Sequence, residues 1–172
     1  MIDDAALPDP PLPDLVLSAF TEDDLAELVV LQRCCWVPEA LINESLDVPA
    51  LHESPAQVLE WATSWTTLVV RRAGRFVGAV RGRREGSTWQ VGRLMVAPDL
   101  AGQGIGSWLL DCVERVAPPD IGQFVLFTGA KSTRNIATYE RAGYRLAELP
   151  DPLPPGHIAG AVHMTKPRPQ VA

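Results

Sequence analysis

The residues of this chain that are best suited to do chemistry lie between positions 96 and 110. This stretch has the pattern of a strand end, a proline-marked turn, a glycine-rich loop and the start of an apolar helix. Glycines at positions 102, 104 and 106 would leave backbone N–H groups accessible at the positive end of that helix. Such groups bind anions, most often phosphates, so the loop is a candidate phosphate site.

Two related phosphate-binding motifs do not fit this loop. A P-loop requires Lys followed by Ser or Thr after its last glycine, whereas Gly106 is followed by Ser107 and Trp108. A dinucleotide-binding fingerprint requires Gly-x-Gly-x-x-Gly and an acidic residue at the end of the next strand. Here only one residue separates the second glycine from the third, and the next expected strand, residues 123–128, contains no acid.

The elements that must position the loop follow from the flanking sequence. Strands are expected at residues 14–19, 68–71, 76–83, 90–96, 124–128, 144–147 and 161–166. Helices are expected from Thr21, from Ser54 to about Ala62, and over residues 104–116 and 133–142. Pro38 and Pro49 bracket an irregular piece, and residues 149–156 form a proline-rich loop. This order predicts an α/β fold with a mixed sheet and helices on both sides.

The glycine loop and a second block together resemble the GNAT superfamily of N-acetyltransferases. The family's pyrophosphate loop usually runs Arg/Gln-x-x-Gly-x-Gly/Ala after a strand that ends in Val-x-Pro; here residues 101–106 follow that pattern, with Ala101 in place of Arg or Gln. Residues 135–144 look like the family's Asn…Tyr-Glu-x-x-Gly-Phe/Tyr segment. The resemblance covers about residues 15–166 and implies a mostly antiparallel sheet of six to seven strands with splayed central strands.

The resemblance also implies a function: transfer of an acetyl group from acetyl-CoA to a primary amine in a ternary complex, without a metal. Backbone groups of Leu94, Met95 and Val96 would pair with the pantetheine arm, and a backbone N–H, expected at Met95, would meet the oxyanion. Asn135 would bind the pantetheine or phosphate region, or cap a helix. Tyr139 would protonate the departing thiolate. The pyrophosphate would lie on Ala101, Gly102, Gln103, Gly104, Ile105, Gly106 and Ser107.

The base that deprotonates the amine is not marked in the sequence. Family members often carry Glu on the fourth strand, but the matching position is Gln90, which cannot accept a proton. We expect a water-mediated route that leads to the acidic N-terminal half, with Glu85 as the alternative base. Arg134 and Lys131 are close enough in sequence to the cofactor loop to contact the 3′-phosphate, although surface solvation also explains them.

A non-catalytic acyl-CoA-binding module is the competing hypothesis. The missing Glu at Gln90 and the missing Arg at Ala101 favour it, whereas Tyr139 favours an enzyme, because a binder needs no acid for a thiolate. An unrelated phosphate-binding α/β domain is the third alternative, but it does not explain residues 135–144.

Length and composition bound the remaining properties. With 172 residues the chain is long enough for one domain, expected at residues 14–166, between a disordered leader (1–13) and a tail (167–172). No run of 18 apolar residues and no signal pattern is present, which favours the cytoplasm and no membrane partner. The three cysteines are expected to be reduced, and the histidines show no spacing typical of a metal site. A homodimer is plausible for the family.

Charge is unevenly distributed along the sequence. Residues 1–60 hold thirteen acids and one base, whereas residues 61–172 hold fourteen bases and eight acids. The acidic total argues against nucleic acid as a partner. Acids interleaved with Trp36, Trp61 and Trp65 would suit a cationic amine, either a small molecule or a protein lysine, and an ordinary solvated surface explains them equally well. The arginines between residues 71 and 84 form a local cluster on two paired strands; alternation puts some of them on an exposed face, and solubility explains them better than nucleic-acid binding.

Overall fold

The computed structural model describes residues 7–152 and 160–169. Its centre is a seven-stranded sheet in the order β1-β2-β3-β4-β5-β7-β6, in which only the β4–β5 pair is parallel. The strands are β1 (Leu15–Ala19), β2 (Thr66–Arg72), β3 (Arg75–Glu85), β4 (Thr88–Val96), β5 (Gln123–Gly129), β6 (Arg145–Ala147) and β7 (Ala161–Pro167). The mixed, mostly antiparallel sheet predicted from the sequence is confirmed.

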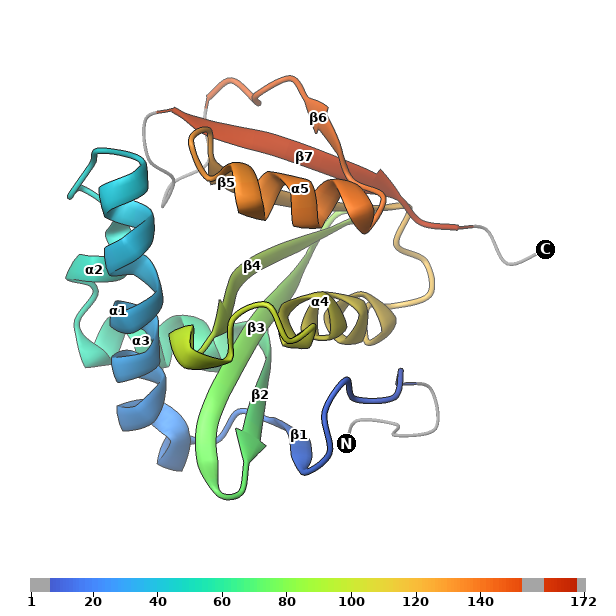
Figure 1. Ribbon diagram of the computed structural model, residues 1–172. Helices are drawn as coiled ribbons and strands as arrows, with labels where there is room; N and C mark the ends of the chain where they lie inside the picture. Colours follow the sequence, from blue (N-terminus) through green and yellow to red (C-terminus); the bar gives the residue numbers. More distant parts are fainter. Residues whose placement is uncertain (1–6, 153–159, 170–172) are drawn as a thin grey trace.

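Helices cover both faces of this sheet (Figure 1). They are α1 (Leu25–Ile42), α2 (Pro49–His52), α3 (Pro55–Ser64), α4 (Ile105–Arg115) and α5 (Thr133–Arg141), with short 3₁₀ turns at Glu22–Asp24 and Pro98–Leu100. α4 packs on one face of β3 and β4, and α1 packs on the other. Leu28 from α1, Val58 from α3 and Leu109 from α4 are fully buried, so apolar side chains from both layers make the core.

Local sequence signals explain where two of the helices begin. Ser54 accepts a hydrogen bond from the Gln57 backbone N–H (3.3 Å), and the Gln57 side chain accepts one from the Ser54 N–H (2.8 Å). This reciprocal capping box starts α3 at Pro55, as the sequence predicts. At the start of α1 the Asp24 carboxylate accepts a hydrogen bond from the Thr21 N–H (2.9 Å).

The central strands separate after a short paired stretch. β4 and β5 pair only at Thr88–Gln123, Trp89–Phe124 and Gln90–Val125. Beyond Gln90 the two strands run on without pairing to each other, while β5 stays paired to β7 along its whole length. The predicted splay of the central strands is therefore present, and it opens a split toward the C-terminal end of β4 (Figure 1).

A bulge in β4 lies inside this split. Ala79 of β3 pairs with Met95, but Arg81 pairs with Gly92, so Arg93 and Leu94 have no register partner on β3. Arg93 adopts a left-handed backbone conformation with φ of 50°, which is uncommon for a residue other than glycine. The backbone of these two residues therefore pairs with neither neighbouring strand.

Two predictions about the chain's irregular parts need correction. Pro38 does not end the first helix: it lies within α1, where the carbonyl that its missing N–H would have bound belongs to the exposed Cys34 and can bind water. Residues 7–13 are not a disordered leader, because Leu7 and Leu12 pack against the core. The Trp108 indole N–H also donates to the Pro8 carbonyl (2.8 Å).

The predicted ends of the chain fall partly outside the described residues. This holds for residues 1–6 of the leader, residues 153–156 of the proline-rich loop and residues 170–172 of the tail. Arg168 is held in place, since its N–H donates to the Gly122 carbonyl (2.9 Å). Within the described ranges, no helix is both long and apolar enough to cross a membrane.

Candidate active site

The glycine loop has the geometry that anion binding requires. Gly102 and Gly104 have φ values of 84° and 85°, which side-chain-bearing residues rarely adopt. Gly104 caps the N-terminus of α4, and the first helical bond runs from the Trp108 N–H to the Gly104 carbonyl (3.0 Å). The N–H groups of the first helical turn are thus not used within the helix. Residues 101–104 and Ser107 are exposed, so this positive helix end is accessible to a ligand.

A cation from α5 lies beside this loop. A Cβ atom placed on Gly102 would lie 3.4 Å from Nη2 of Arg134, so the guanidinium rests against the loop. Across residues 7–152 and 160–169, no side chain forms an ion pair with Arg134. Lys131 behaves differently, since its ammonium is bonded to the Glu44 carboxylate (2.5 Å) and is thereby held by a neighbouring loop. Of the two predicted phosphate contacts, only Arg134 lies beside the glycine loop.

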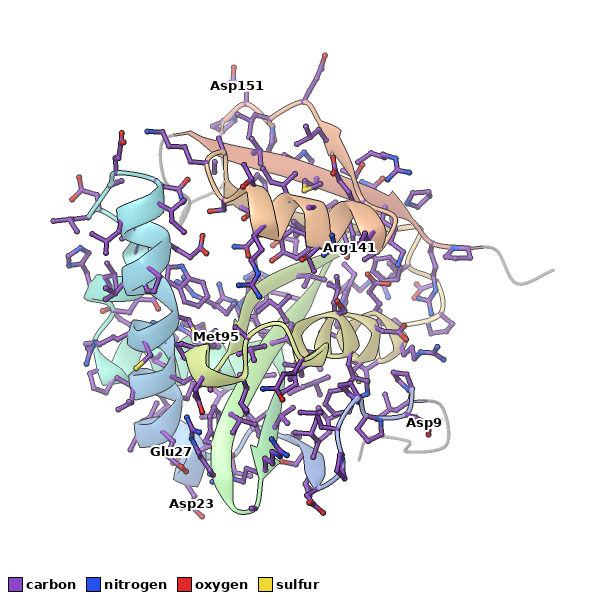
Figure 2. The ribbon with its side chains drawn as sticks, viewed as in Figure 1. Asp9, Asp23, Glu27, Met95, Arg141 and Asp151 are labelled. Carbon is purple, nitrogen blue, oxygen red and sulfur yellow. The ribbon has the colours of Figure 1, made fainter. Side chains whose placement is uncertain are left out.

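The backbone at the end of β4 faces the split at alternate residues. Met95, labelled in Figure 2, pairs with Ala79 of β3, and two residues later the Ala97 N–H donates to the Val77 carbonyl (2.8 Å). Because backbone groups alternate in direction along a strand, Met95 also directs its N–H and C=O toward β3. The Met95 N–H is therefore not open to the split, and the oxyanion contact expected there needs correction. The adjacent backbone N–H that is open to the split belongs to Leu94.

Helix α1 contributes side chains to the mouth of the split. The Cys35 thiol donates to the Val96 carbonyl (3.3 Å), and burial raises the pKa of this thiol to about 11, so it is protonated at neutral pH. One turn further along, the Glu39 carboxylate accepts a hydrogen bond from the Ser132 hydroxyl. Asn43 donates to the same hydroxyl (2.8 Å). These contacts attach α1 to the start of α5 across the split.

Tyr139 lies on α5 near these α1 residues. Burial raises the pKa of its hydroxyl, and the negative charge of Glu39 raises it further. Its ring packs edge-to-face against Tyr144 (centroids 6.1 Å apart). Among the described residues no group is hydrogen-bonded to the Tyr139 hydroxyl, which is therefore a protonated donor without a partner. The Tyr144 hydroxyl instead donates to Glu114 (2.8 Å) and has a structural role.

Asn135 lies in the first turn of α5 and is half-buried. Ser132, not Asn135, occupies the N-cap position, so the capping role considered for Asn135 is not used. Its amide forms no hydrogen bond with any other described residue. It therefore stays a candidate ligand contact.

A groove of 380 Å³ runs between α4 and α5, starting at Ser107 of the loop-proximal turn. Figure 2 shows Arg141 at the end of α5 that lies above α4. The lining residues of the groove are Ser107, Leu110, Asp111, Glu114, Thr138, Arg141, Ala142 and Lys166.

Glu85 cannot act as the base. It pairs with Thr88 at the β3–β4 turn, where β4 is still paired to β5, so it lies at the closed end of the split. From Thr88 to Leu94 the strand rises about 20 Å. Gln90 donates to the Glu85 carboxylate and pairs with Val125 at the last paired position before the split opens. Glu39 is the carboxylate that the structure brings near Tyr139.

Arg81 and Arg83, which the sequence places in a solvated arginine cluster, form a partly buried cluster with Arg93 on the α3 face of β3 and β4. Arg93 is almost fully buried, with 8% of its side chain exposed, and is bonded to Glu53. Arg81 lies over the rings of Trp61 and Trp65, with its Cζ atom 4.5 and 4.0 Å from their centroids. The alternation of Arg81 and Arg83 around Gly82 is the sequence signal that could have placed both arginines on one face.

Arginines of the chain itself already lie over the rings of Trp36, Trp61 and Trp65. Arg81 covers Trp61 and Trp65, and Arg93 lies over Trp36 (5.2 Å). Several N-terminal acids are also engaged by bases of the second half: Asp24 and Glu27 with Arg71, Glu44 with Lys131, and Glu53 with Arg93. The interpretation that this half presents acids to a cationic substrate is not supported.

Comparison with known proteins agrees with this geometry. The sequence profile of the Acetyltransferase (GNAT) family matches residues 26–144. Searches among curated proteins gave no match. Among solved structures, the fold is similar to the PaiA N-acetyltransferase of Thermoplasma acidophilum in complex with coenzyme A (TM-score 0.75, 14% identity, 90% of this chain and 99% of that chain).

Two further structures show the same likeness. An acetyltransferase from Streptococcus agalactiae has a TM-score of 0.71 and 19% identity, over 91% of this chain and all of the other. The ribosomal-protein-S18-alanine N-acetyltransferase of Escherichia coli has a TM-score of 0.64 and 17% identity, over 92% of this chain and 96% of that chain. At these identities the likeness shows a shared fold.

Proposed function

Because this chain belongs to the GNAT acetyltransferase family, we propose that it transfers the acetyl group of acetyl-CoA directly to a primary amine bound in the same complex. The observation that carries this proposal is the split beside the glycine loop. Open backbone at Leu94 and unused N–H groups at the start of α4 lie at the two ends of one short segment. That segment can bind an extended amide-bearing arm and a pyrophosphate together.

The residues of the loop and split fit acetyl-CoA. Gly102, Gly104 and the first turn of α4 would hold the pyrophosphate through backbone N–H groups, so Ala101 removes one side chain but none of the amides. Arg134 adds a positive charge beside the loop. Val96 presents a carbonyl toward the split, where the Cys35 thiol now bonds it, and this carbonyl can accept a second hydrogen bond.

The chain's own groups supply the remaining requirements. Bound acetyl-CoA supplies an activated thioester and a thiolate leaving group. The Leu94 N–H donates to the carbonyl oxygen of that thioester, which stabilises developing negative charge. Tyr139 keeps its proton because burial raises its pKa, and donates it to the thiolate.

The amine must also lose a proton, and we place the acceptor on α1. Glu39 is close enough to Tyr139 to raise the pKa of its hydroxyl, and its carboxylate already accepts the Ser132 hydrogen bond. Water between the amine and Glu39 completes the water-mediated route predicted from the sequence. Gln90 then needs no catalytic role.

The test is product formation. The full chain is incubated with acetyl-CoA and a panel of a polyamine, an aminoglycoside, amino acids and a lysine peptide, and products are identified by mass spectrometry. Addition of one acetyl group to an amine, dependent on the protein, is the expected result. Tight acetyl-CoA binding without acetylation of any amine would contradict an enzyme and support the acyl-CoA-binding alternative.

A further inference from the structure

Arg81, Arg83 and Arg93 form a cluster, called here the arginine cluster, on the side of the sheet that faces α3. Arg81 and Arg83 alternate along β3 and pair with Gly92 and Gln90 of β4, so their side chains share one face. The Cζ atom of Arg83 lies 4.4 Å from the Trp65 ring, which is thus contacted by two guanidinium groups. The guanidinium groups of Arg81, Arg83 and Arg93 therefore lie close enough to repel one another.

The carboxylate nearest this cluster, that of Glu53, is bonded to groups other than Arg81. Glu53 is bonded to Arg93 through one oxygen. Its other oxygen accepts hydrogen bonds from the Gln32 amide (2.9 Å) and the Trp61 indole (3.1 Å). Glu53 therefore pairs with Arg93, and none of the three hydrogen bonds that its carboxylate accepts comes from Arg81.

Arg81 forms no ion pair with any residue that the structure describes. Within the described parts of the chain, no acceptor is hydrogen-bonded to its guanidinium, and its Nε atom is buried without a partner. Burial and the like charges of Arg93 and Arg83, partly opposed by the negative charge of Glu53, lower its pKa to about 9, so it is still charged at pH 7. Buried charges are normally paired, because an unpaired one is costly, and stacking on two tryptophans offsets only part of that cost.

The Arg81 guanidinium lies near the open backbone of β4, where the proposed acetyl transfer takes place. Arg81 lies opposite Gly92, two residues before Leu94, and a Cβ on Gly92 would be only 3.3 Å from its Nε atom. Strand spacing and rise place Arg81 within about 10 Å of the Leu94 N–H. The glycine loop proposed for the cofactor leads into α4, which packs on the other face, so an acceptor must approach from the α1 and α3 face.

We propose that the acceptor amine carries a carboxylate a few bonds from its nitrogen, and that Arg81, assisted by Arg83, binds that carboxylate. The guanidinium can donate two parallel hydrogen bonds to it and so gains an ion-pair partner. The class of acceptor is then an amino acid or a similar amino carboxylate. This inference rests on the proposed acetyl transfer and names its substrate class.

Matched pairs of acceptors test this directly. Release of the CoA thiol is followed with each L-amino acid and with its α-amide, which keeps the amine and removes the negative charge. A charge-assisted hydrogen bond contributes about 1.5–3 kcal/mol, which corresponds to roughly 10–100-fold in kcat/KM in favour of the acid. Arg81→Gln removes that preference by raising KM for the acid far more than for the amide.

The controls separate a binding role from a structural one. Arg83→Gln, at an exposed position, tests the same site if Arg81→Gln does not fold, and it lowers the acid-to-amide ratio several-fold. Arg84→Gln removes a neighbouring arginine that pairs with Asp120 instead, and it keeps the wild-type ratio.

Each outcome decides one claim. Equal use of acids and amides by the wild type, or an equal loss for both in Arg81→Gln, overturns the carboxylate inference alone. Failure to acetylate any amine overturns the proposed function, and this inference with it.

Discussion

The two tyrosines of this chain share an environment but differ in their partners. Tyr139 and Tyr144 contact each other edge-to-face, and burial raises the pKa of both hydroxyls. Tyr144 donates its proton to Glu114, whereas the hydroxyl of Tyr139 has no partner among the described residues. The half-buried Tyr139 hydroxyl is thus free to donate to a ligand, and we propose the thiolate leaving group as its partner in the complex.

Replacing each tyrosine by Phe separates catalysis from stability. Tyr139→Phe is expected to lower kcat by about 100-fold, since general-acid catalysis contributes at least that much, with an unchanged Kd for acetyl-CoA. Tyr144→Phe is the matched control: it leaves kcat within a few-fold and lowers the free energy of unfolding by about 1–3 kcal/mol. Steady-state rates, calorimetric Kd values and urea unfolding check both. An equal fall in kcat would remove Tyr139 from the mechanism.

The thiols of the adjacent cysteines are predicted to react at different pH. Cys34 is exposed, whereas burial raises the pKa of Cys35 to about 11 and that of Cys112 to about 12. Because only the thiolate reacts, iodoacetamide at pH 8 is expected to modify Cys34 and to spare the other two. Alkylation of Cys35 rises as the pH approaches 11.

The same pKa shift affects stability. The folded state favours the neutral thiol of Cys35, so its contribution is complete below pH 9, the ordinary thiol pKa, and is lost as the pH rises toward about 11. Peptide mass spectrometry between pH 7 and 11 measures the alkylation. Rapid modification of Cys35 at pH 8, at the rate of Cys34, would show that its thiol does not lie buried against Val96.

At the scale of the elements, Arg134 at the start of α5 lies beside the glycine loop, and we propose that both bind acetyl-CoA. Arg134→Glu places a negative charge beside Gly102 and is expected to raise the Kd for acetyl-CoA about tenfold, the size of one charge-assisted contact. Lys131→Glu is the matched control in the same loop region, because Lys131 pairs with Glu44 and does not reach the glycine loop. Titration calorimetry of both variants gives the comparison. Equal effects would contradict the assignment of Arg134 alone.

Sequence patterns predicted the elements whose signals are local. The capping box at Ser54, the hairpin at Gly74 and the glycine loop all arise from neighbouring residues, and the structure contains each of them. The break predicted at Pro38 is absent, because a proline is tolerated within a helix where the carbonyl left without its hydrogen bond, here that of Cys34, faces water. Residues 7–13 look polar and proline-rich, yet Leu7 and Leu12 reach the core, which composition does not reveal.

Features set by register were not predictable from one sequence. The bulge at Arg93 moves the open N–H from Met95 to Leu94, and a shift of one residue reverses the direction of every backbone group. Glu85 lies near Gln90 in sequence and in space, but only the pairing of β4 with β5 shows that this end of the split is closed. The cover over Arg81 is not evident from the sequence, because Trp61 and Trp65 are distant from it along the chain.

At the scale of the molecule, the uneven distribution of charge along the sequence is partly matched by ion pairs between its acidic first part and its basic second part. Acids of the first sixty residues bond bases of the remainder, including Arg71 with Asp24 and Arg93 with Glu53. These pairs attach α1 and the segment that follows it to the sheet. Arg81 is a largely buried arginine that forms no ion pair with a described residue, and the inference about the acceptor rests on it.

The β5–β7 part of the sheet is attached to the rest by few strand contacts, so side-chain bridges between the parts have large effects. Lys166 of β7 is bonded to Glu114 of α4 (2.5 Å), with 21% and 8% of the two side chains exposed. Lys166→Met leaves a buried carboxylate unpaired and is expected to lower the free energy of unfolding by about 3 kcal/mol. The double variant with Glu114→Gln recovers part of that loss. Urea unfolding measures both; a smaller loss in the single variant than in the double would contradict the bridge.

The central claim is that acetyl-CoA binds in the split with its pyrophosphate on the glycine loop. Calorimetric titration of the full chain with acetyl-CoA tests it, beside Gly104→Glu and the control Gly86→Glu. Both glycines have positive φ (85° and 60°), so both substitutions strain the backbone, but only the first blocks the loop. The account predicts micromolar binding by the wild type and by Gly86→Glu, and loss of binding in Gly104→Glu. Absence of binding in the wild type, or unchanged binding in Gly104→Glu, would contradict it.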